Sequence, residues 1–192
     1  PWVTQNMQVG DLLVHHSGLP EGAGDLMLWP TPNDFTPQDV IHGLRYLKPA
    51  YSFRAGYAYD NTLYIVAGQV AAAAGGAPYP TLMRREVFDP LGMTRCQIGT
   101  WNRDEVGNVA DPHVIEGGQY VAISAHGAIV HATTMEAAGG VRCSLHDMLT
   151  WAGNWLVPTP QQLQWLSPQQ RHAEWTPYNP MPISKLKREW DG

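Results

Sequence analysis

The segment that most constrains the fold is a polar triplet directly in front of a long, alanine-rich helical pattern. The triplet is Tyr59-Asp60-Asn61, and the helical pattern runs from Thr62 to Ala74. Residues two apart in an extended segment lie on the same side of the backbone, so Tyr59 and Asn61 are predicted to face one space. Asp60 points the other way and is well suited to cap the helix. The triplet therefore predicts a rigid helix start that carries a phenol beside a carboxamide.

The same triplet has a plainer interpretation, as a turn and a helix cap with no further role. With eight tyrosines in the chain, a Tyr-x-Asn triplet is expected by chance about 0.3 times in this length. The triplet alone therefore does not establish a function, and other stretches have to support it.

Composition and charge narrow the classes of function. The 192 residues are 44% hydrophobic and 15% charged, which is ordinary for a soluble globular protein and sufficient for one core. The formal net charge is −5 and the basic residues are scattered, so no nucleic-acid-binding face is expected. No apolar run reaches the length of a transmembrane helix, and no signal peptide is found. Because the chain does not begin with Met, Pro1 looks like a processing boundary or a cut through a longer chain.

Caps and stop signals predict further helices on both sides of the central one. Residues 95–134 lack a helical period and contain only two weak strand patterns, Gln119–Ile123 and Ala128–His131. The predicted helices are Val9–His15, a helix capped by Thr36 that extends to Leu47, Pro80–Phe88, a helix capped by Ser144 that extends to Trp155, and Thr159–Leu166.

Helical spacing also predicts which faces of two helices are buried. On the central helix the predicted buried stripe is Leu63, Val66, Ala67 and Val70, and Gly75-Gly76 is the predicted stop. On the helix after Ser144 the predicted buried stripe is Met148, Leu149, Trp151 and Ala152.

Several stretches, in this order, resemble the serine β-lactamase-related hydrolases: class C β-lactamases, D-alanyl-D-alanine peptidases and the esterases built on the same fold. The resemblance covers roughly residues 3–183. The residues that carry it are Asp11-Leu12-Leu13-Val14-His15-His16-Ser17-Gly18-Leu19-Pro20, Tyr59-Asp60-Asn61, Gly75-Gly76, Phe88-Asp89-Pro90-Leu91-Gly92-Met93-Thr94, Pro112-His113, and Ala138-Gly139-Gly140-Val141 with Ser144 and Asp147-Met148.

The resemblance implies an α+β β-lactamase/DD-peptidase-like fold and a site made from three motifs. Ser-x-x-Lys supplies the acylated serine, Tyr-x-Asn follows, and a Lys- or His-Thr/Ser-Gly lies on a strand. Tyr59 would accept the serine proton and relay it to the leaving group, helped by a nearby lysine cation. Asn61 would hold that lysine and the acyl group. Asp60 departs from the Ser or Ala more usual in class C enzymes, which weakens the case for a β-lactam substrate.

Two of the three motifs are not found where the resemblance places them. No Ser-x-x-Lys precedes Val9, and no Lys-Thr-Gly or His-Thr-Gly follows residue 183. One formal match, Ser184-Lys185-Leu186-Lys187, lies on the wrong side of Tyr59 in a proline-rich tail, and is interpreted as a coincidence. Residues 1–192 are therefore expected to form a single partial domain: most of a helical subdomain with little of the antiparallel sheet. The sequence leaves three explanations open: the rest of the enzyme lies outside this stretch of sequence, has been removed by proteolysis, or is supplied as another chain, which would then be a partner.

Other polar residues suggest weaker sites. Gly139 and Gly140 could line the substrate site, because glycine allows close backbone approach, although a plain turn explains them equally well. The histidines, which include His15, His16, His113, His126, His131, His146 and His172, lack metal-ligand spacing. They are interpreted as structural, and no metal or cofactor is expected. A triad using Ser17 lacks the Gly-x-Ser-x-Gly motif. Cys96 and Cys143 could pair or stay reduced.

The sequence therefore predicts a fragment of a serine hydrolase that acts on a small-molecule ester, amide or β-lactam. By resemblance, the enzyme is expected to be periplasmic or secreted. The alternatives are a truncated or degenerate relative that only binds or assembles, and a metal-dependent hydrolase.

Overall fold

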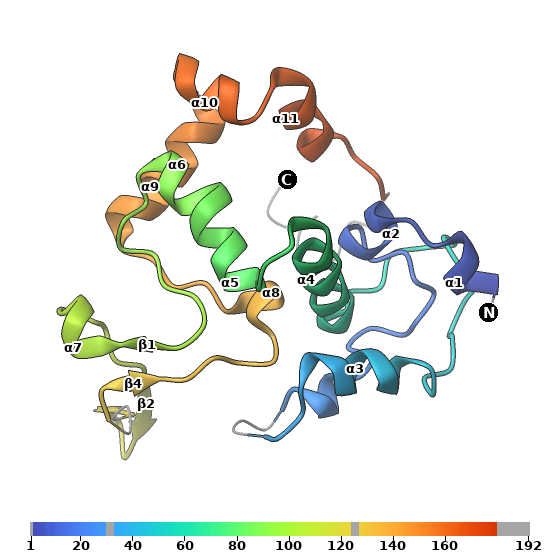
Figure 1. Cartoon of the computed structure of the whole chain (residues 1–192). Helices are drawn as coiled ribbons and strands as arrows, with labels where there is room; N and C mark the ends of the chain where they lie inside the picture. The colour runs from blue at the N-terminus through green and yellow to red at the C-terminus, as the bar shows by residue number, and fades with distance from the viewer. Residues whose placement is uncertain (1, 30–32, 124–126, 180–192) are drawn as a thin grey trace, which may run out of the picture.

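The computed structural model describes residues 2–29, 33–123 and 127–179. Helices dominate this part of the chain, and the long helix α4 (Asn61–Gly75) lies at its centre (Figure 1). The predicted fold, mostly helical with little antiparallel sheet, is confirmed. The helices that pack against α4 are α2 (Val9–Leu13), α3 (Pro37–Leu44), α5 (Tyr79–Leu82) and α8 (Glu136–Gly139).

The remaining helices extend this arrangement at both ends. No helix in the described ranges is long and apolar enough to cross a membrane. These elements are α1 (Trp2–Asn6), a 3₁₀ turn (Asp25–Met27), a π-helical segment (Met83–Phe88) that joins α5 to α6 (Asp89–Leu91), α7 (Arg103–Val106), α9 (Leu145–Leu156), α10 (Pro160–Trp165) and α11 (Pro168–Trp175).

Local capping explains where the main helices begin and end. The Thr36 hydroxyl accepts from the backbone N–H of Asp39, and the Asp39 carboxylate accepts from the backbone N–H of Thr36, as the capping box predicts. Ser144 caps α9 in the same way. At the far end of α4, Gly76 adopts the left-handed conformation (φ +64°) that glycine allows without strain.

Strands form two small antiparallel pairs. β1 (Trp101–Asn102) pairs with β4 (Ile129–Val130), and β2 (His113–Glu116) pairs with β3 (Gln119–Ala122). Glu116 opposite Gln119 leaves a two-residue turn, Gly117-Gly118, in which both residues have positive φ, as a tight hairpin requires. The two predicted strand segments are confirmed.

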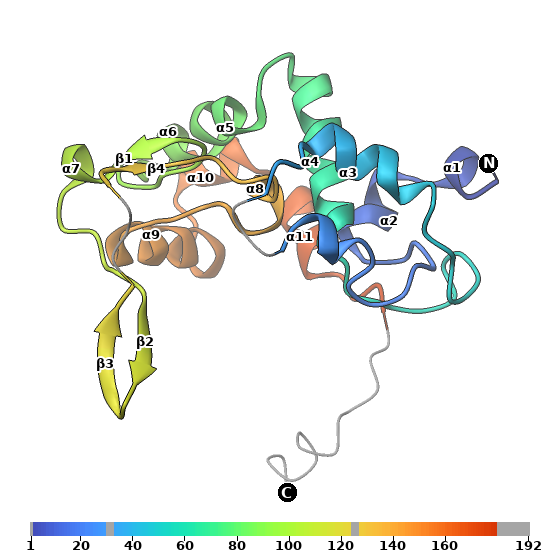
Figure 2. The ribbon, with the colours of Figure 1, turned by 90° about the horizontal axis from the view of Figure 1, so that it is seen from below.

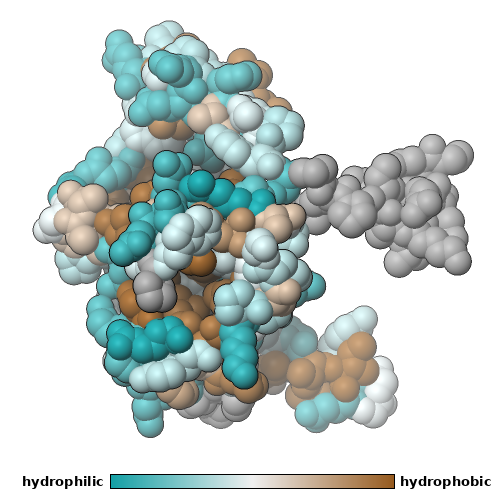
Figure 3. Space-filling view, turned by 90° about the vertical axis from the view of Figure 1, so that its right-hand side faces the viewer, coloured by the Kyte–Doolittle hydropathy of each residue, from teal (hydrophilic) through white to brown (hydrophobic). Residues whose placement is uncertain are grey.

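The β2–β3 hairpin stands off the body of the molecule (Figure 2). All eight of its strand residues are exposed, with Tyr120 at 81%. In the space-filling view it projects beside the body and carries a hydrophobic patch, while hydrophilic side chains frame a recessed hydrophobic area on the body itself (Figure 3). The hairpin is therefore stabilised by pairing between its two strands and not by burial against the body.

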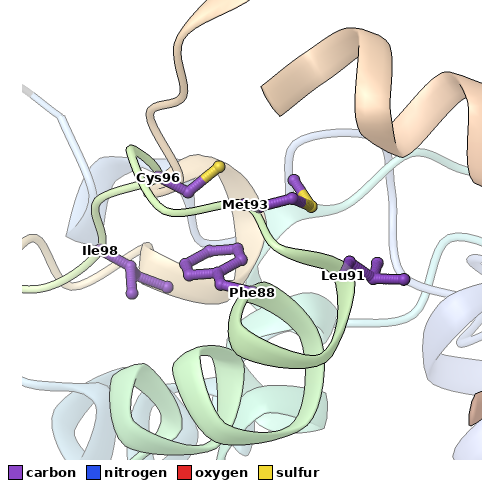
Figure 4. Close-up of a cluster of buried hydrophobic side chains, with 5 residues drawn as sticks. All are labelled: Phe88, Leu91, Met93, Cys96 and Ile98. Carbon is purple, nitrogen blue, oxygen red and sulfur yellow. The ribbon is translucent and has the colours of Figure 1, made fainter. Parts of the chain in front are cut away.

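Two hydrophobic clusters stabilise the body. The first contains Leu28, Val40 and Ile65, and so packs α3 and α4 over the loop that precedes α3. The second gathers around Phe88 at the end of the π-helical segment (Figure 4). Cys96, within this second cluster, forms a disulfide with Cys143, which settles a pairing that the sequence left open. The members of the second cluster are Phe88, Leu91, Met93, Cys96 and Ile98.

Two of the predicted buried stripes are wrong in part. Val70 on α4 is exposed, and on α9 Met148, Leu149 and Ala152 are exposed, Leu149 at 62%. The residues that α9 buries are instead polar, Asp147 and Asn154. Asp147 accepts from the backbone N–H of Arg95, and Asn154 accepts from Arg171, so contacts across the chain decide which face is covered. α3 also ends at Leu44, short of the predicted Leu47.

Candidate active site

The phenol of Tyr59 and the carboxamide of Asn61 meet at the start of α4, as their spacing predicts. The Tyr59 hydroxyl donates to Asn61 Oδ1 over 3.0 Å. Tyr59 is 43% exposed, whereas Asn61 is partly buried. Tyr59 lies in the extended segment, and Asn61 is the first residue of the helix, so the rigid helix start fixes one partner and the other is open to solvent.

Asp60, between them, faces inward. Its Oδ1 accepts from the backbone N–H of Thr62 (2.8 Å) and from the Thr62 hydroxyl (2.6 Å), which makes it the N-cap of α4. The carboxyl is fully buried, and its Oδ2 has no hydrogen-bond partner among the described residues. Burial raises the pKa of Asp60 above its ordinary value, and the nearby charge of Asp25 acts in the same direction.

The loop before α3 supports the triplet from one side. The backbone N–H of Gly22 donates to the carbonyl oxygen of Tyr59 (2.8 Å). The Asn61 Nδ2 amide donates to Asp25 Oδ1 over 3.4 Å. Both ends of the Asn61 carboxamide are therefore occupied, one by a phenol and the other by a carboxylate. Nothing in the sequence pattern pointed to Asp25, which lies 36 residues away.

The segment after α2 supports the triplet from the other side. His15 is 6% exposed, and its Nδ1 accepts from the backbone N–H of Asp60 over 3.1 Å. Its ring packs against the Tyr59 ring, with centroids 4.8 Å apart. Burial lowers the pKa of His15 below its ordinary value. The sequence grouped His15 with scattered structural histidines and gave no signal that it contacts the triplet.

An ion pair ties α2 to the segment that leads into the triplet. The Arg54 guanidinium donates through Nε and Nη2 to the two carboxylate oxygens of Asp11, both over 2.7 Å. The hydrogen bond from Arg54 holds the pKa of the Asp11 carboxyl below its ordinary value, assisted by the backbone N–H of Gln8. The pair therefore anchors residues 52–60 on the same scaffold that carries His15.

Gly139 and Gly140 lie at the end of α8. The backbone N–H of Gly140 donates to the carbonyl oxygen of Glu136, and the Gly140 carbonyl oxygen accepts from the side chain of Arg142. A Cβ atom at Gly140 would lie 2.5 Å from the Cα of Glu136, so close packing at the helix end favours glycine there. Within the described ranges no hydrogen bond joins either glycine to Tyr59 or Asn61, and their role toward a substrate stays a prediction.

The other residues singled out from the sequence lie apart from the triplet. Ser17 Oγ accepts from the backbone N–H of Leu19 and is buried in a turn. His16 contacts Asn179 through its ring, and its backbone N–H donates to the carbonyl oxygen of Asp11. In the described part of the chain no group of three or more His, Cys, Asp and Glu residues could hold a metal ion. The Ser184–Lys187 segment and His126 lie outside the described residues.

A cavity of about 490 Å³ lies elsewhere, between residues 95–110 and the start of α9. None of its lining residues belongs to the triplet. Tyr59, at 43% exposed, opens to solvent and does not line this cavity.

Comparison with known proteins identifies the family of this chain. The beta-lactamase family model matches residues 2–190, which is nearly the whole chain. The chain belongs to the beta-lactamase family.

Solved structures of this family share its fold. A penicillin-binding protein homologue from Pyrococcus abyssi superposes with a TM-score of 0.72 at 21% identity, over 93% of this chain and 40% of that protein. D-amino acid amidase from Ochrobactrum anthropi gives a TM-score of 0.62 at 22% identity, over 86% and 46%. A class C beta-lactamase gives 0.63 at 18% identity, over 86% and 43%. The predicted β-lactamase-like fold is therefore confirmed.

A curated relative is closer in sequence but much longer. An unguisins hydrolase of Aspergillus violaceofuscus is 33% identical over 98 residues, which are 51% of this chain and 17% of that protein. The chain thus spans less than half of these solved structures and under a fifth of this relative.

Proposed function

We propose that Tyr59 and Asn61 form the proton-transfer part of an acyl-transfer site in a serine hydrolase of the beta-lactamase family. In the whole enzyme this site hydrolyses a small-molecule amide, ester or β-lactam through an acyl-serine intermediate. The observation that carries the proposal is the phenol–carboxamide pair at the capped start of α4. Such a pair can accept a proton and, at the same time, hold a polar group of a substrate.

Acylation makes a defined demand on Tyr59. A serine hydroxyl gives its proton to the Tyr59 oxygen as its own oxygen attacks the carbonyl carbon. The bond from that carbon to the leaving group then breaks, and Tyr59 returns the proton to the leaving group. In the second half of the cycle water attacks the carbonyl carbon of the acyl-serine and gives a proton to the Tyr59 oxygen. The bond from that carbon to the serine oxygen breaks, Tyr59 returns the proton to the serine oxygen, and the acid leaves. Each proton that Tyr59 takes is therefore returned within the cycle.

Asn61 must change partners during this cycle. The Tyr59 hydroxyl now donates to Asn61 Oδ1, and a phenolate cannot donate. A turn of the carboxamide would present Nδ2 to the phenolate and free Oδ1 to accept from a lysine cation or a substrate amide. The Asn61 Nδ2 contact with Asp25, at 3.4 Å, is long for a hydrogen bond and so costs little to break.

We favour an amide or a β-lactam over an ester as the substrate. An amine leaves poorly unless it is protonated, so the proton returned by Tyr59 matters most when a C–N bond breaks. Two of the structural neighbours agree with this chemistry, because one is an amidase and the other a beta-lactamase. The departure at Asp60 from the class C pattern favours an open-chain amide over a β-lactam.

The alternative function is binding or assembly without catalysis. Within the described ranges neither Tyr59 nor Asn61 forms a hydrogen bond or ion pair with a lysine or an arginine. The proposal assigns to the rest of the enzyme both the serine and the cation that would favour the phenolate. If nothing supplies them, the phenol–carboxamide pair only binds.

We also propose that the enzyme works in an oxidising compartment, as a secreted or periplasmic protein. Support comes from the Cys96–Cys143 disulfide, because such bonds persist outside reducing compartments.

The test is labelling by a fluorophosphonate probe, in which the serine oxygen displaces fluoride and becomes phosphonylated, followed by intact mass spectrometry. The 192-residue chain alone is expected to gain no adduct, whereas the whole enzyme that contains it gains one. In that enzyme, Tyr59→Phe should slow both this labelling and acylation by an amide substrate by about 10²- to 10⁴-fold, the range lost with general-base catalysis.

Tyr46→Phe is the matched control, because Tyr46 is an exposed phenol that contacts His42 on α3. An unchanged acylation rate in Tyr59→Phe would refute the role of Tyr59. An adduct on the 192-residue chain itself would refute the placement of the nucleophile outside it.

A further inference from the structure

A buried histidine makes contacts that converge on the proposed proton-transfer residue. His15 follows α2, with its backbone in the left-handed region (φ +58°). Its carbonyl oxygen accepts from the backbone N–H of Ala58 (3.2 Å), and its Nδ1 accepts from the backbone N–H of Asp60 (3.1 Å). His15 is therefore hydrogen-bonded to both chain neighbours of Tyr59, Ala58 and Asp60.

The imidazole ring lies among three tyrosine rings. Its centroid is 4.8 Å from the Tyr59 ring, 5.2 Å from the Tyr64 ring and 5.4 Å from the Tyr57 ring. Tyr64 is held in turn, because its hydroxyl donates to the carbonyl oxygen of Leu13 over 2.9 Å. Tyr57 and Tyr59 are both partly open to solvent, at 37% and 43% exposed. The buried imidazole thus gives the half-exposed Tyr59 phenol a fixed face against which to pack.

The hydrogen bond sets the protonation state of the ring. The backbone N–H of Asp60 is a donor, so Nδ1 of His15 must carry a lone pair and the ring proton must be on Nε2. A proton on Nδ1 would set two donors against each other. The strained backbone at residue 15 is the kind of conformation that a structure retains where surrounding contacts fix it.

We propose that His15, as the neutral Nε2–H tautomer, is a positioning residue for Tyr59. Its Nδ1 fixes the backbone at Asp60, and its ring fixes the face of the Tyr59 phenol, so that the Tyr59 oxygen points at Asn61. The catalytic part of this proposal rests on the proposed function. The structural part does not, and it can be tested in the 192-residue chain.

Two substitutions separate the hydrogen bond from the ring contact. His15→Asn retains an acceptor at the position of Nδ1 and tolerates positive φ, but it removes the ring. His15→Phe retains a ring and removes the acceptor. His42→Asn is the control, because His42 packs against Tyr46 on the exposed surface of α3 with centroids 5.8 Å apart.

The first readout is nuclear magnetic resonance of the 192-residue chain. In the wild type, ¹⁵N shifts should show an unprotonated Nδ1 on His15, and a proton on Nδ1 would overturn the proposal without any variant. In His15→Phe, the Asp60 amide should exchange with solvent at least about tenfold faster, the loss of about 1.4 kcal/mol expected for one hydrogen bond. In His15→Asn that protection should remain, while the Tyr59 ring loses its contacts to residue 15 and becomes more mobile.

An Asp60 amide and a Tyr59 ring unchanged in both variants, as in His42→Asn, would refute the proposal. If His15→Phe does not fold, the wild-type tautomer and His15→Asn still decide the matter.

The second readout is the acylation assay on the whole enzyme. His15→Asn should lower the maximal acylation rate by about tenfold to a hundredfold, the cost of a misplaced catalytic group, with little change in the probe concentration at half-maximal rate. An equal loss in both quantities would indicate a merely structural role. If Tyr59→Phe acylates normally, the proposed function fails, whereas the tautomer and the amide exchange still test the position of Tyr59.

Discussion

Substitutions at Asp60 can separate the effect of helix capping from the effect of burying a charge. One oxygen of its carboxyl accepts hydrogen bonds, and the other is buried without a partner among the described residues. Two substitutions separate these features. Asp60→Ala removes the cap, whereas Asp60→Asn retains the capping oxygen and replaces the second carboxylate oxygen by an uncharged NH2 group. Capping oxygens of Asn and Asp are nearly equivalent at helix N-termini.

The cost of Asp60→Ala follows from the hydrogen bonds that it breaks. The Thr62 hydroxyl keeps a second acceptor, the carbonyl oxygen of Ala23 at 3.1 Å. The backbone N–H of Thr62 loses its side-chain acceptor in a buried setting. One buried donor without a partner costs about 1–3 kcal/mol. For a chain of this size, a loss of about 2 kcal/mol, the middle of that range, lowers Tm by about 4–8 °C.

Asp60→Asn is expected to behave differently, with a change within about 1 kcal/mol near pH 4 and a gain at pH 8. Burial raises the pKa of the folded carboxyl above its ordinary value of 3.8. Between the unfolded and folded pKa values the folded chain binds more protons, so this carboxyl makes the wild type less stable as pH rises. The variant lacks that loss, so its advantage over the wild type should grow as pH rises above 3.8 and level off once the folded carboxyl is ionised.

The assay is urea unfolding followed by far-ultraviolet circular dichroism at both pH values, with free energies from linear extrapolation. Titrating groups far from Asp60 are common to both proteins and cancel in the difference. The expectation is refuted if Asp60→Asn lowers the free energy of unfolding as much as Asp60→Ala does. It is also refuted if the difference between Asp60→Asn and the wild type does not vary with pH, because burial then does not penalise the charged carboxylate.

Three further predictions concern the scaffold. Asp11→Asn should destabilise the chain by about 1–3 kcal/mol at pH 7 in urea unfolding, because it breaks the two-point contact with Arg54. The folded pKa of Asp11 is lowered, so this loss of stability should shrink as pH falls below about 4. Reducing the disulfide, which joins residues 47 apart, should cost about 4 kcal/mol on the chain-entropy model, and an unchanged Tm with reductant would contradict it. Arg171→Lys should cost about 2–4 kcal/mol by thermal unfolding, since lysine cannot reach both the carbonyl and the side-chain oxygen of buried Asn154. A loss below about 1 kcal/mol would show that the two-point contact of the guanidinium with Asn154 is dispensable.

The features that the sequence predicts well are those set by chain neighbours. Thr36, Asp60, Ser144 and Gly76 mark helix ends correctly, because a cap is a hydrogen bond or a backbone conformation within a few residues. The meeting of Tyr59 with Asn61 follows from spacing for the same reason. The family resemblance rested on short ordered motifs, and the match over residues 2–190 agrees with it.

The features that the sequence missed depend on contacts between distant segments. β1 exists because Trp101 pairs with Val130, and a two-residue strand has no periodicity to detect. On α9, helical spacing identified an apolar stripe, yet long-range partners of Asp147 and Asn154 determine which side is covered. His15 was missed at the candidate site because its partner lies 45 residues along the chain.

The Cys96–Cys143 bond has a consequence for how the molecule responds to a protease. It closes a covalent ring around β1, α7, both hairpin strands, β4 and α8. The projecting Gly117-Gly118 turn is the exposed tip of that ring, where nicking concentrates. A single cut there would open the ring without releasing a piece, so the nicked protein should migrate as one band on a denaturing gel and separate into two only after reduction.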